Sequence, residues 1–228
     1  EVLSERVPEQ ANRIFHVPLG CTPEFLADCP SPPKPKPPRD LVPYLQEDEP
    51  VAGYVGTLKS RFHHAFLAEV AARRPDVRFV LGGPEPSAPS SQQSDWFQAY
   101  ERLKHVDNVH FIGWVPHDRL GEYLMSFDLL IMPYAPCRFN RNACPAKLWD
   151  YMGTTRPIIA NDVVPEVNMW HEVVHITSSP DEFASAIDER LNESGHIPER
   201  RLMIAKNHTY QALGQRTSAI IESALSSD

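Results

Sequence analysis

The chain has 228 residues, of which 42% are hydrophobic and 23% charged, as in an ordinary soluble globular protein. Its formal net charge of −8 argues against a nucleic-acid-binding protein, because such proteins need a basic face. No apolar run approaches the roughly 18–20 residues that span a bilayer, and no signal peptide is visible.

The cysteines and the first residue suggest where the protein is located and whether the chain is part of a longer protein. No pair of cysteines has metal-type spacing such as C-x-x-C, so we expect four free thiols in a reducing cytoplasm. The chain opens with Glu1 rather than Met, which suggests a fragment of a longer protein. We expect a cytoplasmic protein, with peripheral attachment at the inner membrane face left open.

Two segments precede the regular part of the chain. Residues 1–21 are expected to be a lead-in segment, with a short apolar strand at 14–17. Residues 22–49 include a proline-rich run at 30–38, which favours extended polyproline conformation. This second segment is therefore predicted to be a linker or a surface wrap.

Strands and helices alternate from residue 50 to about residue 196. Short apolar runs predict strands at 51–56, 77–81, 109–112, 128–132, 157–160 and 173–176. Helical spacing or composition predicts helices after most of them, near 62–70, 96–104, 117–126 and from 145 onward. This alternation predicts an α/β fold with a doubly wound parallel Rossmann-like sheet. Residues 197–228 are predicted to form capping or bridging helices, interrupted near Asn207 and Gly214.

The helix expected after residue 144 carries the chemistry. Pro145 suits the first helical position, since the N–H group that it lacks would have no partner there. The amides and the positive dipole end of such a helix can bind a diphosphate. Asp150 could accept hydrogen bonds from the two hydroxyls of a ribose. The segment therefore predicts a nucleotide-sugar site that also includes Ala146.

Neighbouring residues have both a functional and an ordinary interpretation. Gly56 and Thr57 follow a predicted strand, where glycine allows close ligand approach or simply forms a tight turn. Cys144 is either a small residue beside the ligand or a thiol acidified at a helix start. Lys147 lies in the first helical turn, where its charge opposes the helix dipole, which hints at an anion nearby.

Four motifs follow one another along the chain: Val17-Pro-Leu-Gly, Gly53-Tyr-Val-Gly-Thr, Asn108-Val-His-Phe-Ile-Gly-Trp-Val, and Pro145-Ala-Lys-Leu-Trp-Asp-Tyr-Met-Gly followed by Pro157-Ile-Ile-Ala. In this order they resemble the C-terminal, donor-binding half of retaining glycosyltransferases of the GT-B fold, group 1 type. Together they cover about residues 12 to 190 in the order expected for that family.

The resemblance implies roles for further residues. Gly113, Trp114 and Val115 would meet the nucleobase. Lys59 and Arg61 would neutralise the leaving diphosphate and so assist catalysis. The family usually has two glutamates eight positions apart in the donor motif, and these positions hold Asn142 and Asp150 here. Asn142 can still hydrogen-bond the donor sugar, although it brings no charge.

The resemblance also implies an activity. We expect transfer of a sugar from a nucleoside diphosphate sugar, with UDP favoured over GDP, to an unknown acceptor and with retention of configuration. No cofactor or metal is expected, because the sequence shows no acidic metal-binding cluster. The partner would be an N-terminal acceptor domain that this chain lacks. A sugar-nucleotide 2-epimerase relative and a non-catalytic binding or assembly module remain open alternatives.

Overall fold

The computed structural model describes residues 6, 8, 14–45, 49–87, 94–193 and 195–226. Within these ranges, no helix is both long enough and apolar enough to cross a membrane. The four cysteines are all free, as expected.

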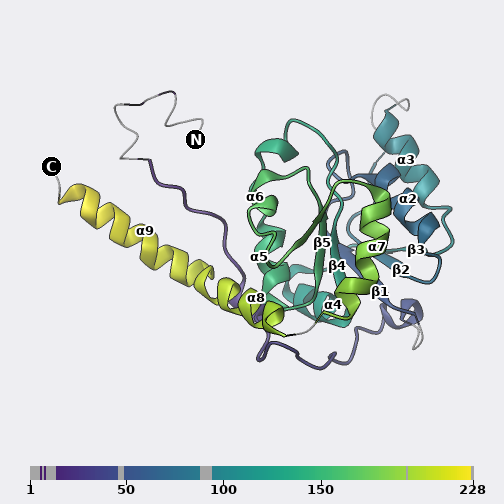
Figure 1. Ribbon diagram of the computed structural model, residues 1–228, viewed down its shortest axis with the longest axis horizontal. Helices are drawn as coiled ribbons and strands as arrows, with labels where there is room; N and C mark the ends of the chain where they lie inside the picture. Colours follow the sequence, from purple (N-terminus) through teal and green to yellow (C-terminus); the bar gives the residue numbers. More distant parts are fainter. Residues whose placement is uncertain are drawn as a thin grey trace.

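A six-stranded parallel sheet forms the centre of the molecule (Figure 1). Its strands are β1 (Val51–Val55), β2 (Arg78–Gly82), β3 (Val109–Gly113), β4 (Leu129–Met132), β5 (Ile158–Asn161) and β6 (His175–Thr177). They lie in the order β3-β2-β1-β4-β5-β6, and every neighbouring pair is parallel. This is the doubly wound Rossmann-like order, which confirms the predicted fold class.

Helices cover both faces of the sheet (Figure 1). One face carries α2 (His64–Arg73), α3 (Asp95–Leu103) and α7 (Pro180–Leu191). The other carries α4 (Leu120–Ser126), α5 (Ala146–Gly153), α6 (Pro165–Asn168) and α8 (His196–Asn207). Short 3-10 turns at Pro23–Phe25, Val42–Tyr44, His117–Arg119 and Asn140–Asn142 complete the connections. Helices α6 and α7 did not follow from the sequence.

The strands are buried on both faces because their side chains alternate between two apolar cores. In β4, Leu129 and Ile131 enter the core beneath α2 and α7, whereas Leu130 and Met132 enter the core beneath α4 and α5. All four are fully buried. This continuous apolar pattern explains why the sequence identified the strands.

The expected strand at residues 14–17 does not form. Residues 14–20 have no regular structure, and Phe15 is 53% exposed. The chain first pairs at Cys21, which makes an isolated parallel bridge with Thr209. The Cys21 amide donates to the His208 carbonyl at 2.7 Å, and the Tyr210 amide donates back to Cys21 at 3.3 Å. Residues 1–5, 7 and 9–13 of the lead-in segment lie outside the described residues.

The proline-rich stretch runs along the domain without regular structure from residue 32 to residue 38. It is attached by an ion pair of 2.5 Å between Lys34 and Asp128 and by a hydrogen bond from Arg156 to Pro32. Just beyond it, Leu41 is completely buried in the α5 core. The stretch therefore lies against the domain.

The expected boundary between residues 196 and 197 falls inside α8. This helix is part of the packed domain, because Leu202 and Ala205 are buried in it. In contrast, α9 (Tyr210–Leu225) projects from the domain, and Leu213 is its one buried residue among those described (Figure 1). The predicted break near Asn207 is confirmed by the end of α8, but α9 continues through Gly214 without interruption.

Candidate functional site

A pocket of about 380 Å³ opens where the strand order reverses, between β1 and β4. Ligands of doubly wound sheets bind at such a switch point, beyond the carboxyl ends of the strands. Three connections line it: the turn after β1, the loop after β4 and the start of α5. Their lining residues are Tyr54, Thr57, Arg61, Tyr134, Phe139, Asn140, Asn142, Ala143, Cys144, Pro145, Ala146 and Lys147.

The pocket is basic although the chain as a whole is acidic. Its lining includes Arg61 and Lys147, and no Asp or Glu among the described residues. The Arg61 guanidinium stacks on the Phe139 ring with its carbon 4.4 Å from the ring centroid. The side chain of Arg61 is therefore positioned at the pocket wall by a cation–π contact.

Lys147 reaches from α5 toward the end of β1. Its Nζ donates to the Val55 carbonyl at 2.5 Å and lies 3.8 Å from the centroid of the Tyr54 ring. Burial lowers the pKa of Lys147 to about 7; the nearby Asp150 carboxylate opposes this shift and Arg61 adds to it. An anionic ligand in the pocket would favour the charged lysine.

The amino end of α5 also faces this pocket, since Pro145, Ala146 and Lys147 all line it. Pro145 is the N-cap residue of the helix rather than its first helical residue, one position from the prediction, and no side chain caps the helix. The amides of the first turn therefore have no side-chain acceptor, which leaves them available to an anion.

Glycines at the ends of three strands allow close backbone packing beside the pocket. The Gly56 amide donates to Gly82 at 2.8 Å, and the Gly83 amide donates to Gly113 at 2.7 Å. Gly56 has a φ of +155°, and a Cβ there would lie 2.0 Å from the Lys147 Nζ. A side chain at Gly56 would therefore displace the Lys147 Nζ from its present position, a consequence that the sequence did not reveal.

Asp150 occupies a different position from the pocket lining. It is 8% exposed, and its Oδ1 accepts a hydrogen bond from the Thr22 amide at 3.1 Å. Burial raises the pKa of Asp150, while the Thr22 hydrogen bonds, His117 and Lys147 lower it. The carboxylate thus already holds the start of the segment 22–49, which the sequence did not predict.

The residues expected at the nucleobase are not in this pocket. Gly113 lines a separate hollow with Tyr100 and His110. Trp114 is 68% exposed, whereas Val115 is buried, with its Cγ2 in the space where a Cβ of Gly82 would lie. They lie apart because β3 is the edge strand and β2 separates it from β1.

The other predicted residues divide between the pocket and the surface. Thr57, Asn142 and Cys144 line the pocket, and the Asn142 side-chain amide donates to the Arg138 carbonyl at 2.8 Å. Lys59 is exposed and is not part of the lining. Sequence analysis missed Tyr54, Tyr134, Phe139, Asn140 and Ala143. Among these five, only Tyr54 could have been suspected from the sequence, because it is a tyrosine within an otherwise apolar strand segment, where it is buried.

Asn161 fixes the loop that follows β4. Its side-chain oxygen accepts from the Tyr134 amide at 2.9 Å, and its amide donates to the Tyr134 carbonyl at 2.8 Å. In the same loop, the Asn140 side chain donates to the carbonyls of Arg61 and Ala135. These paired contacts join the loop after β4 to the turn after β1, so the pocket has a defined wall.

Comparison with known proteins identifies relatives of this chain. Residues 49–193 match the family model described as glycosyl transferases group 1. The glycosyltransferase TuaH of Bacillus subtilis (strain 168), named for teichuronic acid biosynthesis, is 24% identical over 168 residues. That alignment covers 72% of this chain and 41% of the relative, so the chain spans well under two thirds of its length.

Solved structures share the fold. Sucrose-phosphate synthase from Thermosynechococcus elongatus superposes with a TM-score of 0.64 at 18% identity, over 93% of this chain and 53% of that one. Anabaena HepE, solved in complex with UDP and glucose, gives a TM-score of 0.59 at 19% identity, over 82% of this chain and 53% of that one. The chain therefore corresponds to about half of each of these proteins.

Proposed function

Because the chain belongs to the glycosyl transferases group 1 family, we propose that it binds the nucleoside diphosphate sugar donor of a glycosyltransferase. The observation that carries the proposal is the basic pocket between β1 and β4. There the uncapped start of α5 meets Lys147 and Arg61. These groups suit a diphosphate, and no acidic side chain of the described lining would repel it.

The proposed chemistry is stabilisation of the leaving group. When the bond between the sugar and the diphosphate breaks, negative charge develops on the diphosphate. Amides at the helix start and the Lys147 ammonium are already in place to stabilise that charge, so little reorganisation is needed. The transfer step that we propose therefore requires no metal. Retention of configuration follows only from the resemblance to the retaining GT-B class.

We propose UDP as the nucleotide. The structural relative HepE was solved with UDP and glucose, which supports this choice. The acceptor site is proposed to lie in a second domain, since the chain spans about half of its structural relatives. Asn142, exposed at the pocket and hydrogen-bonded to Arg138, is proposed to contact the donor sugar.

Calorimetric titration with UDP, UDP-sugars and GDP-sugars tests the proposal directly. We expect weak binding of a UDP ligand, which Arg61→Ala and Lys147→Met reduce by about tenfold or more, the loss expected for a charge-assisted hydrogen bond. Lys59→Ala is the matched control, because that cation is exposed outside the lining. Absence of binding by the folded protein at millimolar ligand would show that the site assignment is wrong.

The ribose role of Asp150 needs its own test, because the carboxylate is mostly buried. If Oδ2 reaches a ribose, Asp150→Ala weakens binding of a nucleoside diphosphate more than binding of inorganic diphosphate. Equal losses for the two ligands would leave Asp150 only its contact with Thr22.

A non-catalytic binding module is the second candidate. The observation that favours it is Asn142, which stands where the family usually has a charged glutamate and donates its side-chain amide to Arg138. Assay of sugar transfer after joining this chain to an acceptor domain separates the two candidates. Donor binding without transfer would favour the module.

A further inference from the structure

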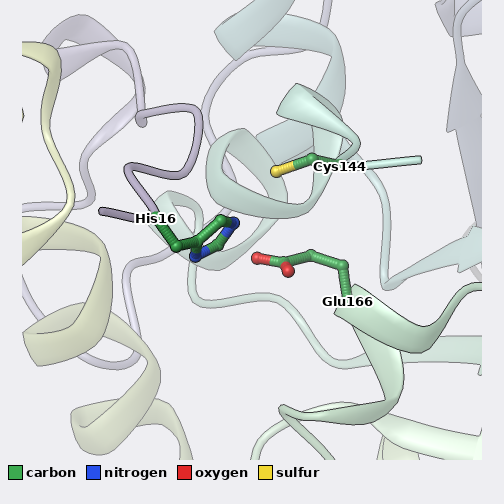
Figure 2. A group of neighbouring side chains, drawn as sticks. All are labelled: His16, Cys144 and Glu166. Carbon is green, nitrogen blue, oxygen red and sulfur yellow. The ribbon is translucent and has the colours of Figure 1, made fainter. Parts of the chain in front are cut away.

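Three potential metal ligands from distant parts of the chain converge beside the start of α5 (Figure 2). His16 comes from the lead-in segment, Cys144 from the loop before α5, and Glu166 from α6. One ligand atom of each residue lies within 4.8 Å of the other two. In Figure 2 the imidazole and the carboxylate point toward each other, and the thiol lies above the space between them.

The donor types favour one kind of ion. A thiolate, an imidazole and a carboxylate are the ligands that zinc binds, whereas Mg²⁺ and Ca²⁺ prefer oxygen ligands alone. In a tetrahedral zinc site, bond lengths of about 2.0–2.3 Å place ligand atoms roughly 3.4–3.6 Å apart. The three side chains therefore need to close by about 1 Å to meet such an ion. His16 is exposed in an irregular segment, so its side chain has room for this movement.

No basic side chain competes with a metal for the three groups among the described residues. Within these ranges, no Lys or Arg forms an ion pair with the half-buried Glu166 carboxylate. The half-buried Cys144 is in no disulfide, and its thiol interacts with the Glu166 carboxylate and with the Leu19 backbone. A divalent cation would supply the positive partner that no Lys or Arg of the described residues provides to this carboxylate.

We propose that His16, Cys144 and Glu166 bind one Zn²⁺ ion, with the fourth coordination position open to water. This site is additional to the proposed sugar transfer, which needs no metal. Its first effect would be structural, because the ion would fasten the lead-in segment to α6 and to the loop that lines the donor pocket. Three protein ligands with one open position are also the pattern of zinc sites that admit a further ligand.

Cobalt substitution provides the decisive measurement. The whole chain is stripped with a chelator and titrated with Co²⁺, whose thiolate complexes absorb in the near ultraviolet and whose tetrahedral complexes absorb strongly in the visible. We expect both bands to saturate at one equivalent and to disappear when Zn²⁺ is added. Titration without a thiolate band would overturn the proposal.

Variants assign the ligands. Cys144→Ser should abolish the thiolate band, and His16→Gln or Glu166→Gln should weaken Zn²⁺ binding by about 100-fold or more. Cys137→Ser and His171→Gln are matched controls outside the cluster and should bind as the unaltered chain does. Equal affinity in Cys144→Ser and the unaltered chain would contradict the assignment.

Circular dichroism of the metal-free variants separates lost ligands from lost folding. If Cys144→Ser does not fold, His16→Gln carries the test, since His16 is exposed and in no regular element. Zinc should also raise the melting temperature of the unaltered chain but not that of His16→Gln. The same zinc-induced shift in both would show that the metal binds elsewhere.

Discussion

Burial makes the charged form of the Lys147 side chain less favourable than it is in water. Burial lowers its pKa from 10.5 to about 7, so near neutral pH part of the population is uncharged. The unfolded chain binds more protons than the folded chain between these two values. The contribution of this group to stability is therefore unfavourable below pH 7 and improves as the pH rises toward 10.5.

Donor binding should reverse this shift and take up a proton. At pH 8 we expect proton uptake when UDP binds, because the diphosphate favours the charged lysine, and affinity should fall by up to about tenfold per pH unit above pH 7. Calorimetry in buffers of different ionisation enthalpy measures the number of protons. In Lys147→Met this uptake should vanish; undiminished uptake would show that another group titrates.

Asp150 links the start of the segment 22–49 to α5 through the Thr22 amide. Replacing it with alanine removes a charged acceptor, so the free energy of unfolding should fall by about 1.5–3 kcal/mol. Asp150→Asn keeps an acceptor oxygen and should cost less. Chemical denaturation measures both changes. An unchanged midpoint for Asp150→Ala would mean that the hydrogen bond contributes nothing.

At single positions, the sequence identified site residues that lie at a strand end or a helix start. It did not identify residues that reach the pocket through contacts with distant parts of the chain. Thr57, Pro145 and Lys147 followed from their places after a strand or at a helix start. Phe139 and Asn140 enter the pocket through contacts with Arg61, which is about eighty positions away in the chain. Such contacts leave no local pattern.

Helix α8 is joined to the sheet domain by a buried charge. Arg201 is completely buried and makes two hydrogen bonds to the Glu193 carboxylate, at 2.8 and 3.0 Å. It also donates to the carbonyls of Thr155 and Val173. The guanidinium therefore connects the segment between α5 and β5, the segment before β6 and the residues just after α7.

Removal of this guanidinium should be costly. Arg201→Met leaves the buried Glu193 carboxylate with only its longer contact to Arg190, at 3.5 Å, and we expect a loss of about 3 kcal/mol in unfolding free energy. The neighbouring Arg200 pairs with Glu172 at the surface, so Arg200→Met should cost under about 1 kcal/mol. Urea denaturation of the two variants provides the comparison. Similar losses at both positions would contradict the assigned role of Arg201.

Among the elements, the apolar strands were predictable and the amphipathic helices less so. The strands of a parallel sheet are buried on both faces, which gives continuous apolar runs. Helix α7 was missed because only four of its twelve residues are buried. The strand expected at 14–17 was wrong because no neighbouring strand pairs with those residues.

For the molecule as a whole, the two C-terminal helices differ in their dependence on the domain. Deleting residues 215–228 removes most of the exposed α9 and should leave the melting temperature nearly unchanged. Deleting residues 197–228 also removes Arg201, Leu202 and Ala205 and should abolish cooperative melting. Thermal melts monitored by circular dichroism test this. A cooperative melt of the shorter chain would show that α8 is dispensable.

The overall architecture was the most predictable level, because alternating strands and helices restrict a chain to few topologies. The arrangement of the site was less accessible. Gly113 at the end of β3 and Trp114 after it lie two strands away from β1, and only the strand order reveals that separation. The alternation of strands and helices along the chain therefore predicted the sheet, whereas the spatial order of the strands required the structure.

The bridge between Cys21 and Thr209 determines how the domain would respond to mechanical load. Residues 14–20 and α9 leave the domain on the same side, next to this crossing (Figure 1). Tension applied through both would act on the two hydrogen bonds at Cys21 before it reached the central strands. Rupture at this point would separate residues 14–20 from α9 while the pocket between β1 and β4 stayed intact.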